Sequence, residues 1–198
     1  AFASAELNNS GKNIKSKTSA SSDYFSTFMG GGSTTEKVAN QAYFESQIAA
    51  GALASQGNPA SAGVAGSYLA GSRMRLFDAN GLEPQQVVLK GLMGAMMLDQ
   101  ISNHYLSTLV LDQGSNVLEN TNKVLSENAN YTTMEHYWDE AYGDVYGADN
   151  ASANSKKYWS SYIDQVNADA DFNTVTNDIN AAFRTGRSAI VANKYEIR

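Results

Sequence analysis

Hydrophobic residues recur at intervals of three and four positions through most of the chain, which is the spacing of one helix face. No stretch shows the sustained two-residue alternation of a half-buried strand, so the pattern predicts an all-α protein folded as a helical bundle. The helices expected from these runs span about 36–54, 60–77, 84–111, 132–147 and, as two helices or one bent helix, 158 to the end of the chain.

The segment 84–111 is the most apolar of these helices. Its run VVLKGLMGAMML has Lys90 as its only charge, so we expect it to lie in the middle of the bundle. Gly91 and Gly94 each cost a helix about 1 kcal/mol relative to alanine, and close packing against a neighbour or a ligand is expected there. Asp99 interrupts an apolar stripe of this helix. A buried carboxylate is paired, protonated or metal-bound, and the sequence leaves these alternatives open.

The two ends of the chain differ in composition. Residues 1–34 are rich in Ser, Asn, Lys and Gly and predict an extended, low-complexity arm, whereas residues 35–198 would form the helical bundle. A polar stretch, 112–131, predicts a long loop with a helical turn near 117–125.

The helix expected over 132–147 carries the most informative polar residues. Thr132 and Glu135 have the spacing of a capping box, which marks the start of a helix. Its apolar face comprises Met134, Tyr137, Trp138, Ala141, Tyr142 and Val145. His136 lies on the other face, where Gly143 leaves space two turns further on.

Two interpretations of this polar face compete. It is either a solvated surface or a metal or acid–base site, because imidazole and carboxylate groups three or four residues apart on a helix can share one ion. A donor set of this kind suits iron, zinc or manganese better than copper(I). The second histidine, His104, is expected to be a hydrogen-bonded packing residue. The candidate metal ligands are His136, Asp139, Glu140, Glu135 and Asp99.

Composition narrows the functional classes. The net charge of −6, from 14 basic and 20 acidic residues, argues against a nucleic-acid-binding protein, which would carry a basic face. Without cysteine the chain has no disulfide, thiolate ligand or thiol nucleophile. Only 17% of residues are charged and Asn and Ser are abundant, which favours an exported bacterial protein. The chain contains no P-loop, dinucleotide fingerprint, nucleophile elbow or H-E-x-x-H motif.

Two segments, GLEPQQVVLKGLMGAMMLDQISNHYL and YTTMEHYWDEAYGDVYG, carry a family resemblance. Over about residues 78–198 the chain resembles imelysin-like bacterial helical proteins, in the branch called domain-of-unknown-function family 4856, related to iron-regulated protein A. The resemblance implies two helical bundle halves, iron-linked uptake, and a lipoprotein of the periplasm or cell surface. It also implies a lipid anchor upstream of this chain and a partner at the outer membrane or cell surface.

Imelysins carry a Gly-x-His-x-x-Glu motif, which this chain matches only in part. His136 aligns with the motif, but Met134 stands at its Gly and Asp139 at its Glu. The resemblance therefore favours a metal-binding protein over a metallopeptidase, because Asp is as good an oxygen ligand as Glu. Three functional hypotheses follow: a metal-binding protein of the periplasm or cell surface, an imelysin-type metallopeptidase, and a non-enzymatic helical module for binding or assembly. We expect no robust peptidase activity.

Overall fold

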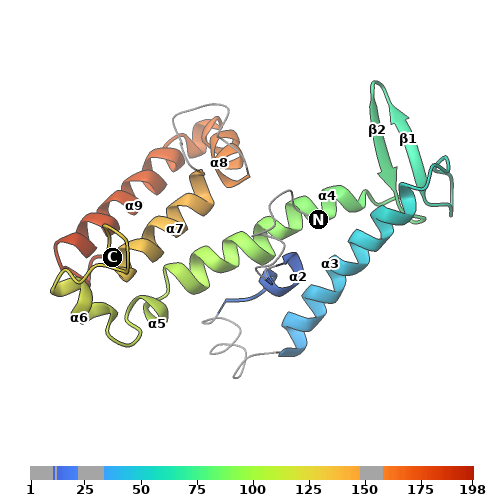
Figure 1. Ribbon diagram of the computed structural model, residues 1–198. Coiled ribbons are helices and arrows are strands. Elements are labelled where there is room, and N and C mark those ends of the chain that lie inside the picture. Colours follow the sequence, from blue (N-terminus) through green and yellow to red (C-terminus); the bar gives the residue numbers. More distant parts are fainter. Residues whose placement is uncertain (1–10, 12, 22–33, 148–157) are drawn as a thin grey trace.

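The computed structural model describes residues 11, 13–21, 34–147 and 158–198. Helices make up most of this part of the chain, and the expectation of a mainly α-helical protein is confirmed. A long central helix runs through the middle of an elongated molecule, with one group of elements against each half (Figure 1). Most of the predicted arm, residues 1–34, lies outside the described residues, and its described part includes helix α2, Ile14–Lys17.

The central helix runs without a break through α4 (Pro84–Leu92), η2 (Met93–Leu98) and η3 (Ile101–Tyr105). The η2 and η3 segments are π-helical, as the i to i+5 hydrogen bonds from the Asp99 N–H to the Gly94 carbonyl and from the Leu106 N–H to the Ile101 carbonyl show. The helix ends before the predicted residue 111, because Ser107 is extended and caps a separate short helix, α5 (Thr108–Leu111).

The N-terminal half of the central helix packs on α3, Thr34–Ala54. A Cβ atom at Gly91 would lie 2.7 Å from the Phe44 ring of α3, so the close approach predicted at this glycine is confirmed. At Gly94 a Cβ would meet nothing within 4 Å among the described residues, so no close neighbour is found there and the ligand alternative stays a prediction.

A β-hairpin replaces the helix predicted over 60–77. Strand β1 (Gly66–Ala70) pairs antiparallel with β2 (Arg73–Phe77), and the pair forms the sheet of the described structure. Gly71 has a φ of +62° in the connecting turn, a conformation that favours glycine over other residues. The prediction failed because both faces of this hairpin are largely exposed, so its strands lack the alternation that marks a half-buried strand.

The C-terminal half of the central helix packs on a second group of helices. These are α6 (Asn116–Thr121), α7 (Thr133–Tyr146), α8 (Trp159–Asn167), η4 (Ala170–Phe172) and α9 (Val175–Val191). The two-helix alternative predicted for the end of the chain is therefore the correct one. None of the helices in the described part is long and apolar enough to cross a membrane.

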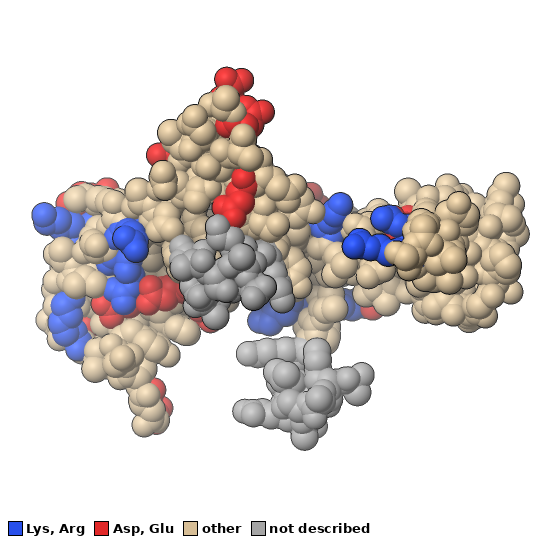
Figure 2. Space-filling view, turned by 90° about the horizontal axis from the view of Figure 1, so that it is seen from above, with Lys and Arg blue, Asp and Glu red and all other residues tan. Residues whose placement is uncertain are grey.

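The main hydrophobic core lies between this second group, α5 and the C-terminal half of the central helix, and is centred on α7. Met134 and Ala141 are fully buried, and the apolar face predicted for this helix is confirmed. The Trp138 indole lies over Gly186 of α9 and donates a hydrogen bond of 2.9 Å to the Phe183 carbonyl. The Trp159 indole joins α8 to the central helix through a bond of 3.1 Å to the Met93 carbonyl. Charged side chains gather around this half, whereas the hairpin end is mostly uncharged (Figure 2).

Candidate functional site

Helix α7 starts and ends as the sequence predicts. The Thr132 hydroxyl accepts a bond of 3.3 Å from the Glu135 N–H, and the Glu135 carboxylate accepts one of 2.8 Å from the Thr132 N–H. Gly147 follows the last turn with a φ of +74°. This reciprocal cap satisfies two backbone N–H groups of the first turn and sets where the helix begins.

Two of the candidate ligands face α9 and are held by one arginine. The Arg187 Nη1 atom lies 3.0 Å from Glu135 Oε1, and its Nε atom lies 2.9 Å from Asp139 Oδ1. Burial raises the pKa of Glu135, but the Thr132 N–H and the Arg187 guanidinium together hold that pKa below its usual value. Both carboxylates therefore act in a structural ion-pair network between α7 and α9.

His136 is not part of this arginine network and pairs with Glu140, four residues further along α7. Its Nε2 atom is 3.5 Å from Glu140 Oε1, and the two side chains are 42% and 39% exposed. The imidazole stacks on the Tyr131 ring with 4.8 Å between ring centroids and 10° between planes. A Cβ atom at Gly143 would meet nothing within 4 Å, so the space predicted beside this face is present.

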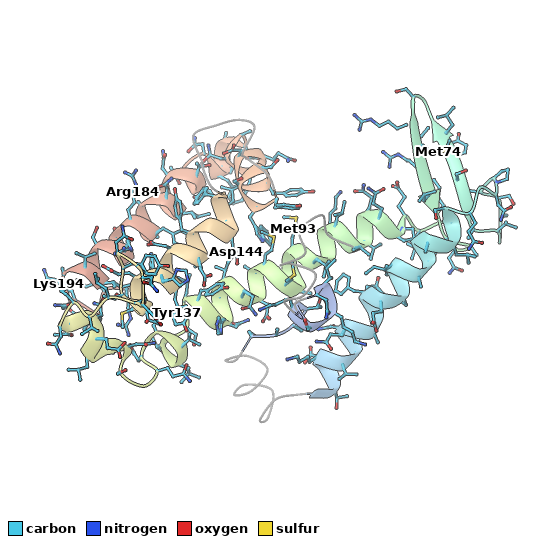
Figure 3. The ribbon with its side chains drawn as sticks, viewed as in Figure 1. Met74, Met93, Tyr137, Asp144, Arg184 and Lys194 are labelled. Atoms are coloured by element: carbon cyan, nitrogen blue, oxygen red, sulfur yellow. The ribbon has the colours of Figure 1, made fainter. Side chains whose placement is uncertain are left out.

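Glu140 is also the point at which α7 meets the π-helical segment η3. The Tyr105 hydroxyl donates a hydrogen bond to Glu140, and burial together with the charges of Glu140 and Asp144 raises the pKa of Tyr105 to about 12. Burial and the Glu140 charge raise the pKa of Asp144 to about 6. Tyr137 and Asp144 lie between α7 and the central helix (Figure 3). Two carboxylates are thus held one helical turn apart in a half-buried position.

The two histidines of the chain meet at Tyr137. The His104 ring centroid is 5.9 Å from that of Tyr137, and the His136 centroid is 6.4 Å from it. Burial lowers the pKa of His104, and the nearby Glu140 charge opposes this effect. A neutral imidazole is therefore favoured at His104, on the edge of the same cluster.

Asp99 lies one turn before His104 on the central helix and has its own partners. It is 7% exposed and accepts bonds from the Ser21 N–H at 3.0 Å, the Ser21 hydroxyl at 2.5 Å and the Asn103 amide at 3.2 Å. The Asp99 carboxylate is thus paired through hydrogen bonds in this structure, and its binding of a metal stays a prediction.

A comparison with known protein families assigns the chain to one of them. The model of the family described as Domain of unknown function (DUF4856) matches residues 1–198. The chain belongs to the DUF4856 family. Searches of curated proteins and of solved structures gave no match. The branch identified from the sequence is thus confirmed, while the wider relationship to imelysins stays a prediction.

The structure separates the five predicted ligands of this DUF4856 protein into three places. Glu135 and Asp139 are at Arg187, Asp99 is at Ser21, and His136 and Glu140 stand together. Within the described ranges, no group of three or more histidine and carboxylate side chains is already arranged around one point as a metal site. Metal binding by any of the five residues stays a prediction.

Three further residues of this DUF4856 site were missed from the sequence. Asp144 was detectable, because it lies four residues after Glu140 and eight after His136 on one helical stripe. His104 and Tyr105 were not detectable from the sequence. The π-helical turns change the direction in which side chains after Met93 point from the central helix, so α-helical spacing does not predict their position. The site combines an imidazole, two carboxylates and a phenol, groups that can hold a cation or exchange a proton.

Proposed function

We propose that this DUF4856 protein binds a divalent metal ion, with iron, zinc and manganese as the candidate ions. His136 and Glu140 would supply two ligands, and Asp144 a neighbouring negative charge one turn beyond Glu140; these three residues are called the His136 cluster below. The observation that supports the proposal is the placement of Glu140 and Asp144 one turn apart with a raised Asp144 pKa. In the described part of the chain, the only ion pair of Glu140 is with His136. A bound cation would neutralise this concentration of negative charge.

The donor types fit such an ion. Imidazole with carboxylate oxygen suits iron, zinc and manganese, and the spacing of four residues points both groups the same way along α7. His136 and Glu140 are each about two-fifths exposed, so an ion would have access from solvent and could keep water ligands. When bound, the metal would supply a positive charge to the cluster, and His136 would have to be neutral.

The same geometry supports a binding protein over a peptidase. Asp139, at the position of the Glu in the imelysin motif, is held by Arg187, whereas His136 pairs with Glu140. No carboxylate at the motif position would then be available as a general base beside the cluster. Metal-dependent cleavage of casein, lost in a His136→Ala variant, would refute this part of the proposal.

A role in metal acquisition outside the bacterial cytoplasm would suit the composition and the resemblance to imelysin-like proteins. We propose an exported protein of the periplasm or cell surface, tethered through a lipid upstream of this chain. Fractionation of native cells tests this, and recovery of the protein in the cytosolic fraction alone would contradict it.

Calorimetric titration of iron(II), zinc and manganese into matched variants tests the metal site. The Glu140→Gln change keeps the size of the side chain and removes one ligand charge, and we expect it to weaken binding by at least about tenfold. The matched control is Asp139→Asn, one residue away, which loses an ion pair to Arg187 but should change affinity by less than about twofold. No binding to wild type, or a loss confined to Asp139→Asn, would contradict the proposal.

A further inference from the structure

One end of the molecule has almost no charge. Residues 46–72 contain no Asp, Glu, Lys or Arg, although 17% of the whole chain is charged. This segment includes the end of α3, the loop after it and strand β1. Figure 2 shows the corresponding end of the molecule as uncharged surface with basic side chains beside it. An uncharged surface loses little hydration free energy when it meets another surface.

The β-hairpin at this end exposes large apolar side chains. Leu69 and Met74 are directly opposed in the register and are 58% and 63% exposed. Opposed residues of an antiparallel pair share a face, so these two side chains form one apolar patch. Tyr68, on the other face, is 57% exposed. The hairpin projects away from the helices, with its turn at the outer end (Figure 1).

The charges of the hairpin are all positive. Arg73 and Arg75 lie on β2, and residues 66–77 contain no acidic residue. Arg75 reaches Glu83 at 2.6 Å, whereas Arg73 is exposed and makes no ion pair with the described residues. The net charge of the whole protein is −6. An anionic surface would therefore repel most of the molecule and attract the basic hairpin end.

We propose that the hairpin end docks on an anionic lipid surface, with Leu69, Met74 and Tyr68 entering the headgroup region and Arg73 contacting lipid phosphates. Leucine and methionine gain free energy when they leave water, tyrosine favours the membrane interface, and arginine binds phosphate while its stem lies along apolar surface.

An added strand from a partner protein would be the alternative occupant, because the outer edge of β2 is free of backbone hydrogen bonds to the described residues. Two features disfavour it. Strand β2 is only five residues long, and its two arginines are of the kind that protects sheet edges from pairing. The exposed apolar residues and the positive charge favour lipid.

Co-sedimentation with vesicles tests the docking surface. Wild type should bind vesicles of equimolar phosphatidylglycerol and phosphatidylcholine, bind phosphatidylcholine alone at least about tenfold more weakly, and lose affinity as salt rises. Replacing both apolar residues, Leu69→Ser with Met74→Ser, should reduce binding by more than about tenfold. The matched control is Leu118→Ser on α6 at the other end of the molecule, where the leucine is 64% exposed, and it should bind as wild type does.

A second measurement does not depend on the folding of the double variant. Both native tryptophans lie in the C-terminal half, so a Leu69→Trp variant places a fluorophore at the hairpin while keeping it apolar. Its emission should shift to the blue with anionic vesicles and be quenched by brominated lipid. The proposal is overturned if wild type does not bind anionic vesicles or if Leu118→Ser loses binding equally. It is also overturned if the Leu69→Trp emission is unchanged, or if the hairpin mediates only self-association.

Discussion

Glu140, rather than Asp139, is the residue that defines the candidate site. Both lie about one turn from His136 in the sequence, at spacings of three and four, and both spacings are compatible with a shared ion. The choice between them depends on Arg187, which comes from α9 and holds Asp139 at 2.9 Å. A contact between residues 48 positions apart cannot be read from helical spacing, so the sequence identified the helix and its histidine but not the partner of that histidine.

Asp144 should make the stability of the folded protein depend on pH. Its pKa rises from an ordinary value of 3.8 to about 6 on folding, because of burial and the Glu140 charge. The folded state therefore binds this proton more tightly, and the free energy of unfolding should fall as pH rises from about 4 to 6. An Asp144→Asn variant should lack this loss and be more stable than wild type at pH 7 by roughly 1 kcal/mol, a value reduced for the partial exposure of the group.

Urea unfolding of both proteins across this pH range measures the effect. Glu140→Gln provides the internal comparison, because removing the neighbouring charge should move the wild-type loss of stability to lower pH. Parallel stability profiles for wild type and Asp144→Asn would show that the Asp144 proton is not coupled to folding.

Among the elements, those with a buried face and a clear cap were the predictable ones. Helix α7 was found with its cap because the Thr132–Glu135 box and an apolar stripe agree on one structure. The hairpin over 66–77 was missed because few of its side chains are buried against other elements. No burial pattern in the sequence therefore distinguishes it from a helix rich in small residues. The π-helical part of the central helix was missed because its i to i+5 bonds have no simple sequence signal.

Two glycines on adjacent helices should respond in opposite ways to alanine. A Cβ at Gly186 of α9 would overlap the Trp138 indole, which is buried and cannot move without disturbing the core. Gly186→Ala should therefore lower the free energy of unfolding by about 1–3 kcal/mol. Gly143→Ala on α7 meets no neighbour and should raise it by about 0.5–1 kcal/mol through helix propensity. Thermal and urea unfolding measure both, and a neutral Gly186→Ala would contradict the packing of α9 on α7.

At the scale of the whole molecule, the central helix connects two functional proposals at opposite ends. The His136 cluster lies where α7 crosses η3, and the lipid-docking hairpin lies beyond α3 and α4 (Figure 1). The sequence predicted the central position of this helix from its apolar character, and its buried Leu92 and Met93 confirm that prediction. The separation of the two ends depends on how α3 and α7 pack on it, which the sequence pattern does not specify. Changes at the hairpin should accordingly leave metal affinity unchanged.

The most direct test of the metal site uses the fact that the chain has two histidines. Long-range nitrogen–proton correlation spectra resolve both imidazole rings, and His136→Ala assigns them. Titration with zinc at pH 7.5 should shift the ring nitrogens of His136 strongly and those of His104 only slightly, and Glu140→Gln should weaken that response. Zinc-independent spectra, or a response confined to His104, would contradict metal binding by His136 and Glu140.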